Sequence, residues 1–326
     1  MSTKLNQFFV DAPPPNINIL IFDVYNMVYR CFFTAYFEFM QHKNAYQQGI
    51  ENKEYTEIEM FEYWKHLFLN SFFSNVRRVQ PNRIIMAIEG KGEIWRKKIY
   101  PEYKANRHHD DKEIDFEAFK TRMRAFLDQL KVTLSNVYFI ALENTEADDV
   151  IAVLTKNLSK NTENKIEIIS SDSDLIQLQT LRNVRQFNAT KQEYITSINP
   201  KVDLEVKILS GDSSDNISGI FKGCGPKTAI KIIDEGLDEY LTNQKAKKSK
   251  KELNEEEIKK IYERNLKIIN FEYIPLEYQE NILKEFNDYK ISKIDPMKVY
   301  NFFVSNGLNK QLDDWQMNFH YFKELI

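Results

Sequence analysis

The sequence predicts an α/β fold with a mainly parallel central sheet, helices on both faces and a helical region after it. Up to about Asn199, short apolar runs alternate with long segments of helical period. This alternation is typical of strand–helix–strand units in a parallel sheet. After Asn199 strand patterns stop and helical patterns continue. We therefore expect an α/β core at 17–198 and a helical region at 199–326.

The individual elements follow from local patterns. Strands are expected at 17–22, 83–89, 136–142 and 165–171, with an edge strand and hairpin at 183–188 and 193–198. Helices are expected at 57–79, 115–131 and 146–158. Residues 1–16 form a Pro-rich tail that contains the apolar cluster Leu5–Phe9. A Lys run followed by a Glu run at 243–257 indicates a solvated loop or a helix start.

Composition limits the classes of function. The chain has 326 residues, of which 42% are hydrophobic and 29% charged, as in ordinary globular proteins. The net charge of −3 means that a nucleic acid would have to be bound by local basic patches. The only two cysteines, Cys31 and Cys224, exclude a disulfide framework and a cysteine-based zinc site. Without an apolar run of about 18 residues or a signal peptide, we expect a cytoplasmic monomer that binds no membrane.

Acidic residues follow the expected strands. Ligands of an open parallel sheet bind outside the carboxyl ends of the strands, so these acids share one edge. The carboxylates at or just after this edge are Asp23, Glu89, Glu146, Asp148, Asp172, Asp174, Asp212 and Asp215.

Each acid by itself has a second explanation, because Asp and Glu commonly cap helices or occupy their first turn. As a group, however, they would repel one another unless cations lie among them. Oxygen ligands suit Mg²⁺ or Mn²⁺ rather than zinc. Two such ions about 3.5 to 4 Å apart are the usual apparatus for phosphodiester hydrolysis.

A basic and aromatic stretch follows Glu89. If it is helical, Arg96, Tyr100, Lys104 and Arg107 share one face, although Pro101 favours two separate turns. We expect Lys104 and Arg107 to neutralise a scissile phosphate, and Tyr103 or Trp95 to stack on a base. The alternative is a solvated basic helix with core aromatics.

A second candidate nucleic-acid element lies at 210–233. Gly223 and Gly225 allow a tight turn whose backbone N–H groups meet phosphates, and Pro226 begins the next helix. Such contacts position a duplex without sequence specificity. A plain glycine turn between helices is the alternative.

In order, the segments IFDVYN, PEYKANR, TEADDVIA, SSDSDLIQL and SGDSSDNISGI with GCGPKTA resemble the motifs of the structure-specific 5′ nucleases. That family comprises flap endonucleases and the 5′-exonuclease domains of DNA polymerases. YERNLKIINFEYIP and KVYNFFVSNGL resemble the ribonuclease H branch of the family, found in T-even bacteriophages. The resemblance runs from about Ile17 to Leu308 and implies a PIN-like core, a helical arch at about 90–115 and a helix–hairpin–helix at about 208–234.

The resemblance also implies roles for residues. Lys104 and Arg107 match the family's active-site Lys and Arg at the base of the arch. Tyr103 lies where the resemblance implies an aromatic residue near the scissile nucleotide. Glu89 stands where the family usually has Asp, which affects the first metal site. The residues implied for a first Mg²⁺ are Asp23, Glu89, Glu146, Asp148 and Asp172, and those for a second are Asp174, Asp212 and Asp215. The residues implied or expected to contact DNA are Arg96, Lys97, Gly223, Gly225, Lys227 and Thr228, with K⁺ at the hairpin.

We therefore predict a Mg²⁺-dependent 5′-3′ exonuclease and flap endonuclease that acts on duplex, flap or nicked DNA and on RNA–DNA hybrids, with primer removal in phage replication as its role. Two alternatives remain open: a nonenzymatic DNA-binding replication accessory, and a PIN-type single-strand ribonuclease. Leu5–Phe9 is a candidate ligand for a sliding clamp. The C-terminal helices, with the aromatic segment 313–322, are a candidate contact for a single-strand DNA-binding protein, or else core packing.

Overall fold

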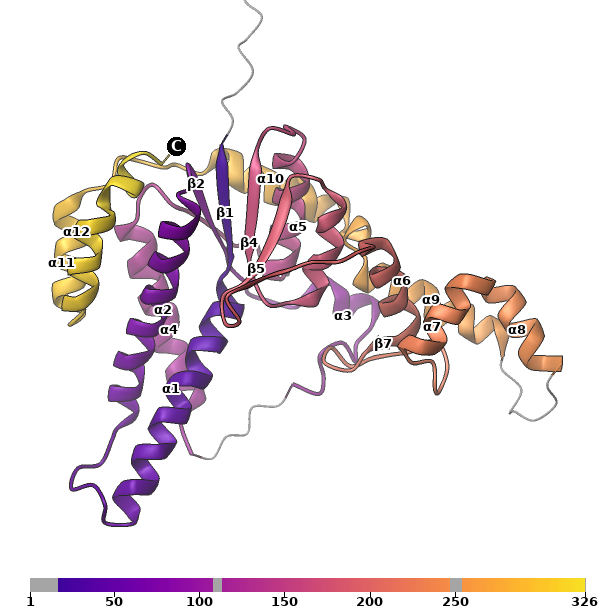
Figure 1. The fold of residues 1–326 in the computed structure, drawn as a ribbon, viewed down its shortest axis with the longest axis horizontal. Helices are drawn as coiled ribbons and strands as arrows, with labels where there is room; N and C mark the ends of the chain where they lie inside the picture. Colours follow the sequence, from indigo (N-terminus) through magenta and orange to yellow (C-terminus); the bar gives the residue numbers. More distant parts are fainter. Residues whose placement is uncertain (1–16, 108–112, 247–253, 326) are drawn as a thin grey trace, which may run out of the picture.

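A computed structural model describes residues 17–107, 113–246 and 254–325. Within them the central sheet has six strands in the order β3-β2-β1-β4-β5-β6. The first five strands along the sheet run parallel, and β6 pairs antiparallel at the edge, as predicted (Figure 1). Their bounds are β1 Asn18–Asp23, β2 Arg83–Ala87, β3 Tyr138–Ile140, β4 Lys165–Ile169, β5 Val184–Asn188 and β6 Glu193–Ile195.

Both faces of the sheet are buried, which explains the continuous apolar run of β1. Leu20 and Phe22 belong to one core, and Ile19 and Ile21 to the other. The first core packs against α1 (Val24–Gln47), α2 (Glu57–Val79), α4 (Phe116–Thr133), α11 (Pro296–Ser305) and α12 (Asn309–Lys323). The second packs against α5 (Ala147–Leu158), η1 (Ser173–Thr180) and α10 (Leu276–Asp288).

Local sequence signals set several helix starts. The Thr56 hydroxyl accepts from the Glu59 N–H, and the Glu59 carboxylate accepts from the Thr56 N–H, so a capping box begins α2 at the predicted residue. The predicted helix start in the acidic run is α9 (Glu255–Ile269), which Asn254 caps. Of the Lys run Lys245–Lys251, the part from Lys247 on lies outside the described residues.

The helical region divides into two parts. A lobe forms from α6 (Pro200–Ser210), α7 (Pro226–Glu235), α8 (Leu237–Ala246) and α9, with a core that includes Leu209, Ile220 and Ile232. After α9, Phe271 of η2 (Phe271–Tyr273) already packs in the second core of the sheet. The chain then returns to the sheet, where α10, α11 and α12 complete its two cores. A two-stranded pair, β7 (Gly211–Asp212) and β8 (Ile217–Ser218), was not predicted, because strands this short have no period.

The basic stretch after β2 differs from a continuous helix. It forms α3 (Trp95–Ile99) and then a turn over 101–106, and Lys104 has a positive φ of 58°. Pro101 cannot continue the helix, which explains the break. Arg96, Tyr100, Lys104 and Arg107 therefore do not share one helical face. Residues 108–112 of the expected arch lie outside the described residues.

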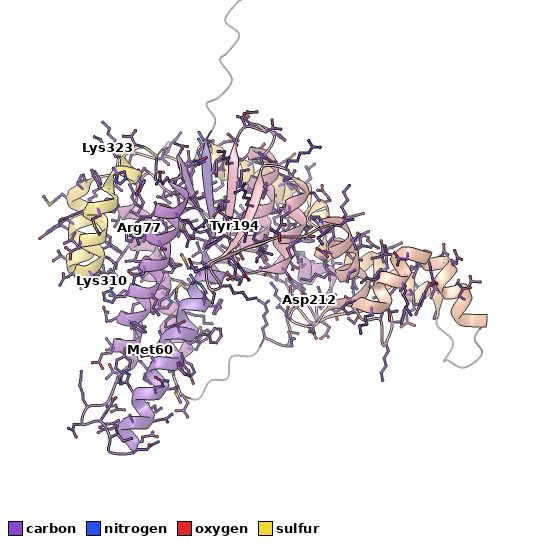
Figure 2. The ribbon with its side chains drawn as sticks, in the orientation of Figure 1. Met60, Arg77, Tyr194, Asp212, Lys310 and Lys323 are labelled. Atoms are coloured by element: carbon purple, nitrogen blue, oxygen red, sulfur yellow. The ribbon has the colours of Figure 1, made fainter. Side chains whose placement is uncertain are left out.

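The layout places the carboxyl edge of the sheet between two projections. The α1–α2 pair extends away from the sheet on one side, and the α6–α9 lobe lies on the other (Figure 1). Asp212 lies where that lobe meets the core (Figure 2). Among the described residues, every helix is too short or too polar to span a bilayer.

The aromatic segment 313–322 belongs to the core rather than to a partner surface. Trp315 is 4% exposed and Phe322 is fully buried, and both pack on Phe73 of α2. Core packing was the alternative to a binding surface, and the structure favours it. The tail with Leu5–Phe9 lies outside the described residues.

Candidate active site

The acids at the ends of β1 and β4 serve as helix caps and also face the site. One oxygen of Asp23 accepts from the Asn26 N–H at 3.0 Å, and the other accepts from the Ser170 hydroxyl at 2.8 Å. Asp172 caps η1 by accepting from the Asp174 N–H at 2.8 Å. The two explanations offered by the sequence are therefore compatible, because capping is what holds these carboxylates at the sheet edge.

A first group of carboxylates lies within mutual electrostatic reach. Burial raises the pKa of Asp23 to about 6, and the charge of Asp172 adds to the effect. Burial also raises the pKa of Asp148 well above its usual range, with Asp172 and Asp23 contributing. Glu89 is reached by solvent, yet desolvation in the cleft raises its pKa against the opposing charge of Lys104. Carboxylates in this state favour a bound cation.

A second group consists of Asp174, Asp212 and Asp215, which each offer one oxygen within 4.8 Å of the others. Lys207 of α6 pairs with Asp174 and lies 2.7 Å from Asp212. Burial opposes ionisation of Asp212, but hydrogen bonds from Lys207 and Ser214 lower its pKa to about 2. The all-oxygen donor set of both groups fits a hard divalent ion. Lys207 was not predicted, because its only signal in the sequence is its place in the last turn of α6 before Asp212.

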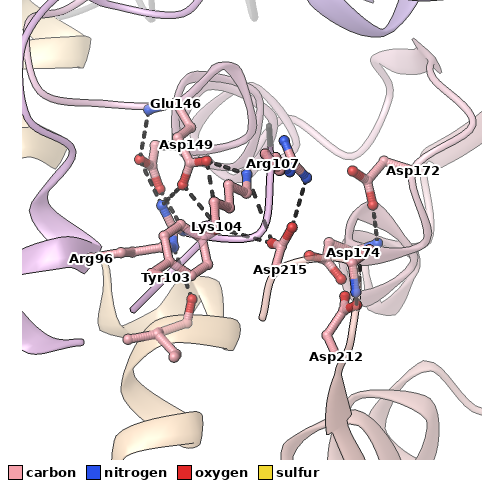
Figure 3. A network of polar contacts seen from close by, with 12 residues as sticks. Arg96, Tyr103, Lys104, Arg107, Glu146, Asp149, Asp172, Asp174, Asp212 and Asp215 are labelled. Atoms are coloured by element: carbon pink, nitrogen blue, oxygen red, sulfur yellow. Dashed lines mark hydrogen bonds and ion pairs between the residues drawn. The ribbon is translucent and has the colours of Figure 1, made fainter. Parts of the chain in front are cut away.

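Two cations lie between the two groups of carboxylates: Lys104 in the turn at 101–106 and Arg107 directly after it (Figure 3). Lys104 pairs with Glu146 and lies 3.7 Å from Asp215, while Arg107 lies 2.7 Å from Asp215. The Tyr103 hydroxyl lies 3.0 Å from a carboxylate oxygen of Asp215 and 3.1 Å from one of Glu146, so that these two acids share its single proton. Burial would raise the pKa of Glu146, but the charges of Lys104 and Arg96 and the hydrogen bonds from Lys104 and Tyr103 together hold that pKa below its ordinary value. Glu146 is therefore ionised at neutral pH.

The turn that carries Lys104 is docked on the segment that carries Asp215. The Lys104 N–H donates to the Asp215 carbonyl at 2.9 Å, and the Asn216 amide donates to the Glu102 carbonyl at 2.7 Å. The Asn106 amide donates to the Ser213 carbonyl at 2.9 Å. Neither asparagine was predicted, because nothing in the sequence indicates that these segments meet.

Arg96 corrects an expectation. It was expected to contact DNA, but only 3% of its surface is exposed. Its guanidinium donates at 2.8 Å to Glu146 and to the Ile268 carbonyl, and it pairs with Asp149 at 2.8 Å. A buried Arg paired with two carboxylates supports the site from beneath and is not available to a phosphate.

The expected base stacking is also not supported for two aromatics. Trp95 is 2% and Tyr103 4% exposed, so neither ring has a free face. Phe33 of α1 is 58% exposed and was not predicted. Together with Tyr29, Glu89 and Arg107 it lines a cavity of about 480 Å³ at the sheet edge. This cavity is the space open to a substrate beside the first group of carboxylates.

The glycine turn lies in the α6–α9 lobe. Gly223 has a positive φ of 93° with open space around it, and Gly225 is the N-cap of α7, which begins with Pro226. Lys227 is exposed and Thr228 is half-buried in the first turn of α7. Lys97 on α3 is also partly exposed. These groups are accessible to a ligand, in contrast to Arg96.

Fold and site together define a class of protein. A parallel sheet whose carboxyl edge gathers two groups of carboxylates around a lysine and an arginine has the groups that phosphodiester hydrolases use. Residues 18–207 match the family described as "5'-3' exonuclease, N-terminal resolvase-like domain", and residues 198–318 match "T4 RNase H, C terminal". The chain belongs to the 5′-3′ exonuclease family and is a nuclease.

Individual relatives agree with this assignment. The chain is 31% identical to the ribonuclease H of Enterobacteria phage T4 over 275 residues, which cover 79% of this chain and 87% of that protein. It is 32% identical to the 5'-3' exonuclease of Aquifex aeolicus over 51% of this chain and 57% of that one. DNA polymerase I of Streptococcus pneumoniae is 29% identical over 72% of this chain, which spans only 26% of the polymerase.

Solved structures support the fold. The flap endonuclease of bacteriophage T5, crystallised with DNA and metal ions, has a TM-score of 0.55 at 16% identity, covering 89% of this chain and 99% of that one. The T5 5′-exonuclease with bound divalent zinc ions has a TM-score of 0.56 at 16% identity, covering 83% of this chain and 99% of that one.

Proposed function

We propose that this nuclease depends on Mg²⁺ and hydrolyses RNA or DNA 5′ ends on duplex, flap or nicked DNA and on RNA–DNA hybrids, leaving a 5′-phosphate. One observation carries the proposal: Lys104 and Arg107 lie between two groups of carboxylates at the mouth of a cavity. Cations and carboxylates at this spacing provide binding for a phosphate and for the ions that assist its hydrolysis.

We assign one ion to each group of carboxylates, because both groups offer oxygen ligands. The first would be held by Asp23, Glu89, Glu146, Asp148 and Asp172, and the second by Asp174, Asp212 and Asp215. When bound, such ions supply an activated water and stabilise the leaving oxygen. Mn²⁺ has the same ligand preference and is expected to substitute.

The protein's own groups orient the substrate. Lys104 and Arg107 pair with Glu146 and Asp215 here, and in the complex they exchange these partners for oxygens of the scissile phosphate. Tyr103 holds Glu146 and Asp215 through its hydroxyl, and Arg96 holds Glu146 from beneath. Fixed groups of this kind lower the cost of reorganisation in the transition state.

Duplex binding is proposed for the α6–α9 lobe. Gly223, Gly225, Lys227 and Thr228 would hold the phosphate backbone at the start of α7, with K⁺ at the hairpin, and Lys97 would contact DNA beside the site. A PIN-type single-strand ribonuclease has no use for such a lobe. Preference for duplex substrates over free single strands therefore separates the two functions.

The biological role we propose is removal of primer RNA during phage DNA replication, in keeping with the relative named ribonuclease H. The tail with Leu5–Phe9 remains a proposed ligand for a sliding clamp. A single-strand DNA-binding protein would contact the C-terminal helices, where Met297, Tyr300 and Val304 of α11 are exposed. Deleting residues 1–16 tests the first contact, and replacing the exposed Met297, Tyr300 and Val304 by Ala, which leaves the core of the sheet intact, tests the second; stimulation by the partner is measured in both cases.

The decisive experiment is cleavage of a labelled 5′-flap substrate by wild type in Mg²⁺, in Mn²⁺ and in EDTA, and by Asp172→Asn in Mg²⁺. We expect metal-dependent cutting near the junction, with a loss of at least a hundredfold in the variant, because a ligand oxygen becomes an amide. Tight binding of the flap without cutting in either metal would instead indicate a nonenzymatic DNA-binding accessory.

A further inference from the structure

A second cavity adjoins the site on the other side of Glu89. It has a volume of about 530 Å³ and lies between α4 and the ends of β2 and β3. Glu89 and Gly90 line this cavity and also the first one. A nucleic-acid strand bound in the first cavity could therefore continue past Glu89 and Gly90 into the second cavity.

Backbone packing fixes the wall between the two cavities. A Cβ on Gly90 would lie 1.7 Å from the Leu142 carbonyl oxygen, so only glycine fits there. The Gly90 N–H donates to the Thr145 carbonyl at 3.0 Å, and the Asn144 N–H donates to the Lys91 carbonyl at 2.8 Å. The second cavity is thus a preformed feature of the rim.

The second cavity has an apolar wall and charged groups of both signs: its lining includes the cations Lys91, Arg124 and Lys131 and the acids Glu89, Asp128 and Glu143. Arg124 and Lys131 both line it, one above the other on α4, about 10 Å apart along the helix. Both are exposed, and within the described ranges neither has a carboxylate at ion-pair distance. Arg124 lies beside the Tyr25 hydroxyl. Leu127, between the two cations, is buried and provides an apolar contact.

We propose that this cavity binds the 5′-terminal nucleotide of the substrate strand, with its 5′-phosphate against Arg124 and Lys131 and its base against Tyr25 and Leu127. The inference rests on the proposed function, since it places the scissile phosphate in the first cavity. The volume is within the range of small-molecule sites, about 300 to 1,000 Å³. A terminal phosphate carries a charge of about −1.5 to −2, more than a diester, and so gains more from two cations.

The test compares nicked duplexes whose 5′ ends carry a phosphate or a hydroxyl. We expect wild type to cleave the phosphorylated end with a kcat/KM about tenfold higher. The ratio should fall close to one in the double variant Arg124→Ala/Lys131→Ala. Arg122→Ala removes the same charge from the same helix outside the cavity and should leave the ratio unchanged. Asp128→Asn removes an acid from the cavity lining and should raise the ratio of kcat/KM for the phosphorylated end to kcat/KM for the hydroxyl end.

Two further readouts keep the inference separate from the proposed function. Cleavage of a long 5′ flap by wild type reports the proposed function by itself. Binding of both nicked duplexes in EDTA, followed by fluorescence anisotropy, gives a phosphate preference that does not depend on cleavage. The inference would be overturned if wild type cleaved and bound the phosphorylated and the hydroxyl ends equally well. It would also be overturned if the double variant kept the preference for the phosphorylated end. Either result counts even if wild type cuts the long flap.

Discussion

The backbone N–H of Lys104 donates a 2.9 Å hydrogen bond to the carbonyl oxygen of Asp215. This bond joins the turn after α3 to the segment before α7, and the Asn216 amide adds a second bond to Glu102 at 2.7 Å. A cation and a carboxylate of the site are therefore positioned by the same contact, although they come from distant parts of the chain.

Replacing Asn216 tests this docking. Asn216 has a positive φ of 59°, so Asn216→Gly keeps the backbone conformation and removes only the side-chain bond. We expect faster hydrogen exchange at the Lys104 amide and flap cleavage that is about ten- to a hundredfold slower, because small misplacements of catalytic groups are costly. Unchanged exchange together with unchanged cleavage would show that the docking has no part in positioning Lys104.

Loss of the buried arginine should destabilise the whole fold. Arg96→Met removes the only cation paired with the buried Asp149 among the described residues and leaves Glu146 with Lys104 alone. We expect the free energy of unfolding to fall by about 3 to 5 kcal/mol, measured by urea denaturation. The neighbouring Lys97→Gln, at a partly exposed position, should change it by less than about 0.5 kcal/mol. A small effect of Arg96→Met would mean that these carboxylates are compensated in another way.

Lys207 pairs with Asp174 and Asp212, where the second divalent ion is proposed. Lys207→Met should therefore raise the affinity for Mn²⁺ in isothermal titration calorimetry, because the ion no longer competes with an ammonium group. The metal-free variant should have a lower Tm, since the acids then repel one another. Lys201→Met, at an exposed position of the same helix, is the matched control. Weaker Mn²⁺ binding by Lys207→Met would contradict this competition.

The raised pKa of Asp23 predicts how stability depends on pH without metal. The folded-state value of about 6 exceeds the unfolded value of about 3.9, so protonation stabilises the fold. This contribution is fully present below pH 4 and is lost as the pH rises through 6. Asp23→Asn should thus gain stability relative to wild type as pH rises from 4 to 7 in EDTA. Urea denaturation at pH 4 and pH 7 measures the free energy of unfolding of both proteins. If the difference between variant and wild type is the same at the two pH values, the pKa of Asp23 is not raised.

Much of the fold was predictable because its signals are local. Apolar runs located the strands β1 to β5, and the helical period of residues 57–79 located α2. The acidic edge was predictable too, since parallel strands bring their carboxyl ends together whatever the details of packing. Glycine and proline placed the turn before α7 in the same way.

The sequence by itself determined the order of elements, the acids at the sheet edge and the basic stretch beside them. Only the tertiary structure decided which cations face those acids. Arg96 and Lys104 are equally basic in the sequence, but the first is buried beneath Glu146 and the second is at the cavity. Lys207 enters the site because α6 packs against η1. Such pairings depend on contacts between distant segments, and neither propensity nor periodicity carries information about them.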